Sequence, residues 1–355
     1  MSVRRLRDHG LRIGALEAGP SNSIADVAGV AVGHVTVVRD EPEPPAGRGV
    51  ARTGVTAITP RDLARLRSEP VVAGTAVLNG AGEMTGSLQI REWGTFETPV
   101  YLTATMSVGR IYDGAVAAAA AADPSVGVDD VVIPVVAECD DSWLNDARVV
   151  QVEATDTAAA LDAAGGEVGQ GAVGAGTGMI CFDYKGGIGT ASRTASGGQA
   201  VVGVLVLANF GSRPDLRVDG VPVGRLLGEQ PAEREQRQAG GSCIAVVATD
   251  APLNSHQLSR LARRAGLGLG RTGSVGHHHS GEIFLAFSSS ARHPATEYGE
   301  DVDPLFSAAV DATEEAVLNA LWHAESTQGR DGRVIEALPH DEVLELLAAH
   351  RRLEA

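Results

Sequence analysis

The sequence has few aromatic residues and few cysteines, and each shortage excludes a class of protein. Only 4% of its 355 residues are Phe, Trp or Tyr, so the core has to be built mainly from Ala, Val, Leu and Ile. The three cysteines are an odd number without Cys-x-x-Cys spacing. That usage excludes a disulfide scaffold and suits a reducing compartment. We therefore predict a cytoplasmic protein with a large aliphatic core.

Basic clusters and long apolar runs are also missing. The formal net charge is −16, from 29 basic and 45 acidic residues. Residues 1–19 alternate charged and single apolar residues, unlike a signal peptide, and no later stretch is long enough to span a bilayer. The sequence therefore predicts no nucleic-acid and no membrane partner. Its acidic balance suits substrates that carry a free amine.

Short apolar runs that end at Gly or Pro are interleaved with alanine-rich stretches. We expect strands at residues 54–60, 71–78, 131–136, 200–209 and 281–288. We expect helices at residues 111–122, 155–164, 254–265 and 303–323. Thr155 and Asn254 are the expected N-caps, and Gly266 is the expected end of the third helix. Such interleaving indicates sheet layers covered by helices.

The character of the chain changes at residues 212–240, which contain three prolines and the charged run 229–237. We interpret this stretch as an exposed linker. Because strands and helices continue on both sides of it, we expect it to divide one domain, residues 1–355, into two chains rather than to separate two domains.

Gly241-Ser242 stands directly after this linker and opens the apolar run 243–248. If the Gly241–Ser242 bond breaks, Ser242 becomes an N-terminus whose amine lies beside its own hydroxyl. An α-amine has a pKa of roughly 7.7 to 8.0, which suits a base at neutral pH. The neighbouring Cys243 would face the opposite side of a strand, so we predict that it belongs to the core.

Several blocks of the sequence, taken together and in order, resemble one family, the self-cleaving L-aminopeptidase/D-alanine-esterase-amidases (DmpA-like), which include the β-peptidyl aminopeptidases. The blocks are residues 23–27, 134–138, 143–146, 176–179, 185–193, 204–211, 241–242, 246–253 and 280–283. The resemblance implies an α/β (α+β) fold with four layers, an αββα sandwich. It also implies autocleavage into chains 1–241 and 242–355, and assembly of the paired chains into homo-oligomers.

The resemblance further implies a hydrolase that releases the N-terminal residue of small peptides, amides or esters. We expect neither a cofactor nor a metal. It makes Ser242 the nucleophile and Asn209 an oxyanion-hole donor, and it makes Ser280 and Glu282 the groups that orient the new amine. In an extended chain Ser280 and Glu282 point to one face, where they can act together. Glu138, after an expected strand, is the candidate for binding the substrate's own amine.

Two positions depart from the family pattern. The segment 138–146 has no Tyr as a second oxyanion donor, so that donor stays open, with backbone N–H groups as candidates. His277, His278 and His279 stand where small polar residues are expected, and they could affect the pocket entrance or its pH response.

Other patterns favour simpler interpretations. Residues 268–273 match Gly-x-Gly-x-x-Gly but follow an expected helix rather than a strand, which predicts a loop. The histidine triplet cannot direct all three rings at one metal ion. Asp140, Asp141 and Asp146 are interpreted as a solvated turn.

Two alternative functions remain at this point. The first is a self-cleaving acyltransferase of the ornithine acetyltransferase type, although those enzymes, like the related nylon-oligomer hydrolases, use Thr at the cleavage point. The second is an uncleaved, non-catalytic binding protein.

Overall fold

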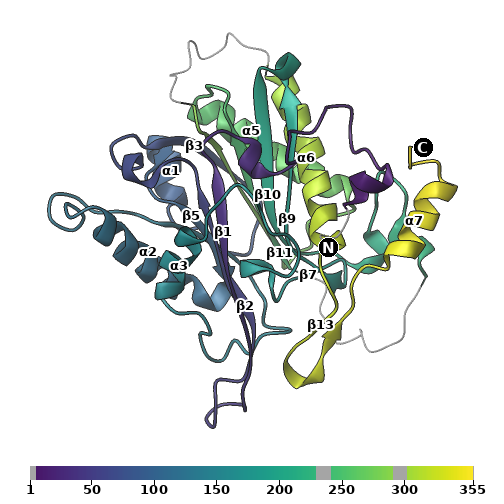
Figure 1. Ribbon diagram of the computed structural model, residues 1–355, viewed down its shortest axis with the longest axis horizontal. Helices are drawn as coiled ribbons and strands as arrows, with labels where there is room; N and C mark the ends of the chain where they lie inside the picture. The colour runs from purple at the N-terminus through teal and green to yellow at the C-terminus, as the bar shows by residue number, and fades with distance from the viewer. Residues whose placement is uncertain (1–4, 229–240, 291–301, 355) are drawn as a thin grey trace.

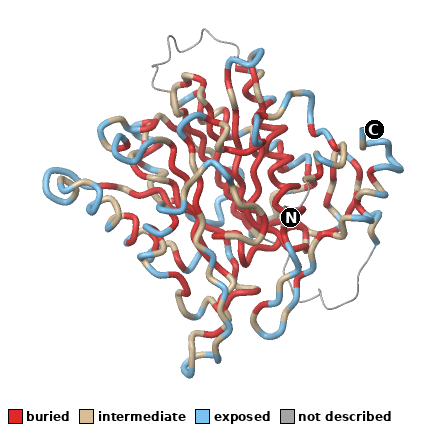
Figure 2. Tube along the Cα trace, in the orientation of Figure 1, coloured by how far each residue is buried: buried red, intermediate tan, exposed pale blue. Residues whose placement is uncertain are grey.

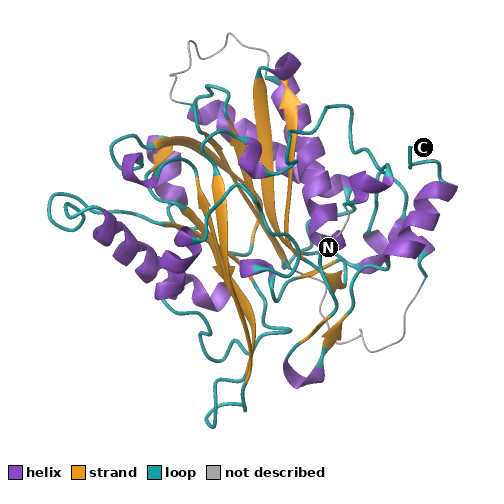
Figure 3. Ribbon diagram, viewed as in Figure 1, coloured by secondary structure: helices purple, strands orange, loops and turns teal. Residues whose placement is uncertain are grey.

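The computed structural model describes residues 5–228, 241–290 and 302–354. Two β-sheets face each other between two layers of helices (Figures 1 and 3). The smaller sheet has the strand order β1-β2-β5-β6, and the larger has the order β4-β3-β12-β11-β10-β9. The strands of the smaller sheet are β1 (Ala31–Asp40), β2 (Val50–Thr59), β5 (Val100–Ala104) and β6 (Val135–Cys139). Those of the larger are β3 (Val71–Gly80), β4 (Thr95–Phe96), β9 (Gly187–Ala195), β10 (Ala200–Asn209), β11 (Ser242–Thr249) and β12 (Gly281–Ser288).

The helices cover the outer faces of the two sheets. The smaller sheet packs against α2 (Val108–Ala122) and α3 (Thr155–Asp162), and the larger sheet against α5 (Ser255–Arg271) and α6 (Asp303–Trp322). The remaining helices are α1 (Ser87–Trp93), α4 (Val223–Leu226) and α7 (His340–Ala349). Several short 3-10 helices are also present, together with two short hairpins, β7–β8 (Ile180–Cys181, Tyr184–Lys185) and β13–β14 (Thr327–Gln328, Val334–Ile335). No helix among the described residues is long and apolar enough to cross a membrane.

Three apolar clusters lie between these layers, and together they form the buried centre of the molecule (Figure 2). Successive side chains along each strand point to opposite faces of the sheet. Along β11, Cys243, Ala245 and Val247 face α5 and α6, whereas Ile244 and Val246 pack between the sheets. The expected αββα sandwich is therefore confirmed, and so is the core position of Cys243.

Most expected elements are present, with shifted ends. The structure reproduces the strands at 200–209 and 281–288, whereas the strand expected at 131–136 is β6, four residues later. Asn254 is the N-cap of α5 as expected and forms a capping box with Gln257, but α3 is capped at Ala154 rather than Thr155, with no side-chain hydrogen bond.

Gly266 does not end α5, because the helix continues to Arg271. A Cβ atom on Gly268 would lie 2.5 Å from the Thr313 Cβ on α6, so glycine at 268 permits close helix packing. The loop expected at 268–273 is accordingly wrong, since its first half is the last turn of this helix.

The linker expected at 212–240 is wrong for its described part. Residues 213–215 form a 3-10 helix and α4 follows, with Leu216, Val218 and Val223 fully buried. These apolar side chains join the cluster between the larger sheet and α5 and α6. Residues 229–240 lie outside the described residues.

Candidate active site

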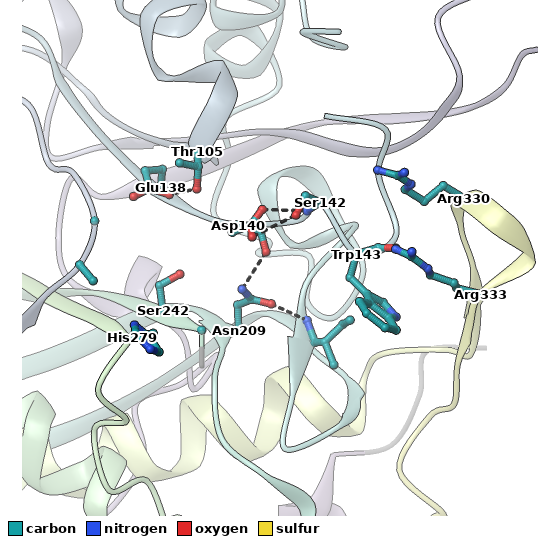
Figure 4. Close-up of a pocket in the computed structure, with 14 residues that line it drawn as sticks. Thr105, Glu138, Asp140, Ser142, Trp143, Asn209, Ser242, His279, Arg330 and Arg333 are labelled. Atoms are coloured by element: carbon teal, nitrogen blue, oxygen red, sulfur yellow. Dashed lines mark hydrogen bonds between the residues drawn. The ribbon is translucent and has the colours of Figure 1, made fainter. Parts of the chain in front are cut away.

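Ser242 and Asn209 face each other at one end of the larger sheet. Asn209 is the last residue of β10 and Ser242 the first of β11, and the two are direct partners in this antiparallel pair. By strand alternation, both side chains face the space between the sheets. Both residues are nearly buried, and both line a pocket of about 700 Å³ (Figure 4).

Asn209 is fixed at both ends of its carboxamide. Its Oδ1 accepts a hydrogen bond from the Ile180 N–H (2.9 Å), and its Nδ2 donates to the carbonyl oxygen of Asp140 (2.8 Å). The Nδ2 group has two protons, so one remains for a further acceptor.

Opposite Ser242, burial raises the pKa of the Cys139 thiol well above its usual value, although a hydrogen bond with the Ser242 hydroxyl opposes this. The Cys139 thiol is therefore neutral.

Gly241 has a backbone that other residues rarely adopt. Its φ is +152°, and a Cβ atom there would lie 1.9 Å from the Asn209 carbonyl oxygen. Its own carbonyl oxygen accepts a hydrogen bond from the Gly281 N–H (3.0 Å) on β12. The peptide between Gly241 and Ser242 is therefore held in place by both neighbouring strands.

Ser280 and Glu282 form a buried pair beside that peptide. The Ser280 hydroxyl donates a hydrogen bond to Glu282 Oε1, which agrees with the alternation expected from the sequence. Glu282 Oε2 is buried and has no hydrogen-bond partner among the described residues. Burial raises the pKa of the Glu282 carboxyl, and the Ser280 hydrogen bond opposes the shift. Glu282 is in register with Cys243, so it lies on the helix-covered face of the sheet and not in the pocket.

Glu138 lines the pocket at the end of β6 (Figure 4). Its Oε1 accepts a hydrogen bond from the Glu83 N–H (2.9 Å), and its Oε2 accepts one from the Thr105 hydroxyl. Burial raises the pKa of the Glu138 carboxyl above its usual value, while these hydrogen bonds favour the charged form. A nearly buried carboxylate that opens into a pocket is a suitable acceptor for an ammonium group.

Lys185 is a buried cation that sequence reasoning did not single out as a site residue. Its Nζ donates to the carbonyl oxygens of Gly176 (3.1 Å), Met179 (2.7 Å) and Gly186 (2.7 Å). Burial lowers the pKa of the ammonium to about 7, an effect that Cys181 and Asp141 oppose. The Met179 carbonyl belongs to the same peptide group as the Ile180 N–H that binds Asn209. One peptide therefore joins Lys185 to Asn209.

The opposite wall of the pocket was also missed. Trp143, Arg330 and Arg333 line it, the two arginines coming from the turn between β13 and β14 (Figure 4). No short motif marks the two arginines, which lie 88 and 91 positions after Ser242, and Trp143 belongs to the block 143–146 but was assigned no role from the sequence. His279 is the one residue of the histidine triplet that lines the pocket.

The expected solvated turn is wrong for two of its three aspartates. Asp140 is exposed, but Asp141 and Asp146 are buried. Asp141 accepts a hydrogen bond from Asn145 Nδ2 (3.0 Å), and Asp146 forms an ion pair with Arg148 (2.5 Å). Within the described residues no three His, Cys, Asp or Glu side chains form a group that could hold a metal ion.

Comparisons with known proteins agree with this architecture. The model of peptidase family S58 matches residues 22–335. A β-peptidyl aminopeptidase of Sphingosinicella microcystinivorans is 42% identical, over 99% of this chain and 93% of its own length.

Solved structures are similar over nearly the whole chain. The PH0078 protein of Pyrococcus horikoshii has a TM-score of 0.90 at 40% identity and covers 99% of this chain and 100% of its own. The L-aminopeptidase D-Ala-esterase/amidase of Ochrobactrum anthropi, described as a variant of the Ntn hydrolase fold, has a TM-score of 0.88 at 39% identity and covers 99% of both chains. These matches support a hydrolase with an N-terminal nucleophile, and neither alternative function gains support. The chain belongs to peptidase family S58 and is an aminopeptidase.

Proposed function

We propose that the chain cleaves its own Gly241–Ser242 bond and then uses Ser242 as an N-terminal nucleophile. In the first step Ser242 Oγ attacks the Gly241 carbonyl carbon, the C–N bond breaks, and the hydroxyl proton moves to the departing nitrogen. Water then opens the resulting ester and releases the Gly241 carboxylate. The products are chains 1–241 and 242–355.

The fold is compatible with such a cut. The second chain would contribute β11 and β12 to the middle of the larger sheet, where β11 pairs with β10 and β12 pairs with β3. It would also contribute α5 and α6, which cover that sheet. Because both chains share one sheet and one core, they would stay associated after cleavage.

The observation that carries the proposal is the unpaired Glu282 Oε2 next to the strand that begins at Ser242. In the intact chain this buried carboxylate oxygen has no partner, which costs free energy. The nitrogen of Ser242 is a main-chain atom in the plane of the sheet, so it can be approached from either face. Cleavage would therefore create an amine between the Ser242 hydroxyl on the pocket face and the Ser280–Glu282 pair on the other.

In the mature enzyme this amine would take the proton of the Ser242 hydroxyl as Oγ attacks the substrate carbonyl. The second proton of Asn209 Nδ2 would stabilise the oxyanion. The amine would then return the proton to the leaving group, and water would hydrolyse the acyl-enzyme. Glu138 would bind the substrate's N-terminal ammonium.

The substrates we propose are small peptides, amides and esters with a free amine. Because two relatives are named β-peptidyl aminopeptidases, short peptides with an N-terminal β-amino residue are the first substrate class to assay. A panel of p-nitroanilides of α-, β- and D-amino acids would rank the alternatives. A homo-oligomer of cleaved pairs in the cytoplasm also stays a prediction, and light scattering checks its assembly state.

Mass spectrometry of purified protein tests the proposal directly. Wild-type protein should give two fragments, the smaller starting at Ser242, whereas Ser242→Ala should give one full-length chain without amidase activity. The matched control is Ser242→Thr, which should retain some cleavage because threonine keeps the hydroxyl. Processing or activity in Ser242→Ala, or an intact chain in active wild-type protein, would contradict the mechanism.

A further inference from the structure

The pocket has opposite charges on its two sides. Glu138 lies on one side, and Arg330 and Arg333 lie on the other, with Ser242 and Asn209 between them (Figure 4). Asp140 also lines the pocket, but its carboxylate accepts hydrogen bonds from the Ser142 N–H (2.9 Å) and hydroxyl (3.0 Å). These neutral donors hold the carboxylate in its own turn but do not neutralise its charge.

The two arginines carry a surplus positive charge. Arg330 Nε and the Arg333 guanidinium share a single carboxylate, that of Asp331, at 3.1 and 3.2 Å. Their side chains are 25% and 33% exposed, so solvent and substrate can reach them. Within the described part of the chain, the two terminal nitrogens of Arg330 make no hydrogen bond. One guanidinium edge is thus available for an anion.

The turn that carries these arginines is hydrogen-bonded to residues 143 and 144. The Arg330 N–H donates to the Leu144 carbonyl (2.9 Å), and Arg333 donates to the Trp143 carbonyl (3.1 Å). The Arg333 guanidinium also stacks over the Trp143 ring, 4.3 Å from its centroid. These contacts hold the Arg333 guanidinium in the pocket wall, so it is not a freely moving surface side chain.

We infer that Arg330 and Arg333 bind the C-terminal carboxylate of the substrate, so that the enzyme prefers short peptides with a free carboxylate. This inference rests on the proposed function, which places the substrate amine at Glu138 and its scissile carbonyl at Ser242. The leaving residue then extends along Trp143 towards the arginines. A guanidinium binds a carboxylate through two parallel hydrogen bonds, which fixes orientation as well as charge. A pocket of about 700 Å³ has room for a short peptide.

The test compares β-alanyl-alanine with its C-terminal amide, because the two differ only in the group that would meet the arginines. Wild-type enzyme should have the higher kcat/KM for the free acid, chiefly through a lower KM, since this contact is made equally in the ground and transition states. In Arg330→Gln the ratio of kcat/KM for acid over amide should fall by about 10- to 100-fold. Arg330→Lys should retain part of the preference.

A matched control is Arg65→Gln, which removes one positive charge from an exposed ion pair with Glu69. It should leave the acid-to-amide ratio at the wild-type value. Equal kcat/KM for acid and amide in wild-type enzyme, or an unchanged ratio in Arg330→Gln, would overturn the inference while leaving the proposed function standing. Failure of wild-type enzyme to hydrolyse either substrate or any aminoacyl p-nitroanilide would instead overturn the proposed function.

Discussion

Replacing Lys185 by Met should affect both the stability and the catalytic rate of this enzyme. The ammonium donates to three backbone carbonyls, one of which belongs to the peptide between Met179 and Ile180. The N–H of that peptide holds Asn209 Oδ1 at 2.9 Å. In its charged form Lys185 polarises this peptide, which strengthens its hydrogen bond to Asn209 and in turn the Nδ2–H groups of that side chain; because burial lowers the pKa of Lys185 to about 7, this effect is largest below neutral pH.

The cost to stability follows from the three carbonyls. Methionine fills similar space but leaves these buried acceptors without a partner, at about 1–3 kcal/mol each. Removal of a buried ammonium offsets part of that loss, because its desolvation costs several kcal/mol in the wild type. A net loss of about 3 kcal/mol is expected, which lowers the Tm of a 355-residue chain by about 4 °C.

The expected cost to catalysis depends on Asn209, the proposed oxyanion-hole donor. An oxyanion-hole donor contributes about 2.7–4 kcal/mol to transition-state stabilisation, and a displaced or less polarised donor loses part of that. We expect kcat to fall by about 10-fold in Lys185→Met, with little change in KM. Steady-state kinetics at a temperature where the variant is fully folded, together with thermal unfolding, separate the two effects.

A control and a double variant make the reasoning refutable. Thr177→Val removes a hydrogen bond to the Gly174 carbonyl in the same segment (2.6 Å) without touching the 179–180 peptide, so it should lower stability but not kcat. In an Asn209→Ala background, Lys185→Met should cost no further kcat. A lower Tm with unchanged kcat, or additive losses in the double variant, would refute the link from Lys185 to Asn209.

Three further predictions concern the site itself. Asn209→Ala should lower kcat by about 100- to 1,000-fold, and a loss below 10-fold in steady-state assays would show that the oxyanion is stabilised elsewhere. Glu282→Gln, introduced into uncleaved Ser242→Ala, should raise the Tm at pH 7. The folded-state pKa of Glu282 lies above its unfolded value, so the stabilising contribution of this carboxyl is present at low pH and lost as the pH rises. The Tm gain of Glu282→Gln should therefore vanish below pH ~4.5. An equal Tm gain at pH 4 and pH 7 would contradict this. Gly241→Ala should block processing, because its Cβ would lie 1.9 Å from the Asn209 carbonyl oxygen; fragments of normal mass and yield would show that the strand end can move.

The resemblance named Ser242 and Asn209 as candidates, and the structure brings them together because they lie at adjacent strand ends, while their roles stay predictions. Alternation alone placed Ser280 and Glu282 on one face, and the structure joins them by a hydrogen bond. The apolar run after Ser242 likewise predicted β11 and the core position of Cys243. These predictions rest on a period of two, which strand geometry fixes locally.

Errors arose where tertiary packing overrides a local rule. Gly266 was expected to end α5 and Gly268 to lie in a loop, but the helix continues to Arg271, and Gly268 lets it pack closely against Thr313 of α6. Asp141 and Asp146 have the composition of a solvated turn, but Asn145 and Arg148 supply partners that permit burial. Thr313 is distant from Gly268 in the sequence, whereas Asn145 and Arg148 lie within four residues of the aspartates, so in the second case the partners were visible in the sequence but their geometry was not.

The pocket shows the same division between local and distant information. The side that would perform the chemistry comes from adjacent strands, so its residues could be named from pattern and resemblance. The side that would choose the substrate comes from a short turn after α6, whose position depends on hydrogen bonds to Trp143 and Leu144. That turn is hydrogen-bonded to residues 143 and 144 and belongs to neither β10, β11 nor β12, so we expect substrate preference to vary independently of the proposed nucleophile and oxyanion donor. We therefore expect residues 327–335, rather than the residues around Ser242, to determine substrate preference. Variants in residues 327–335 are the ones that test this.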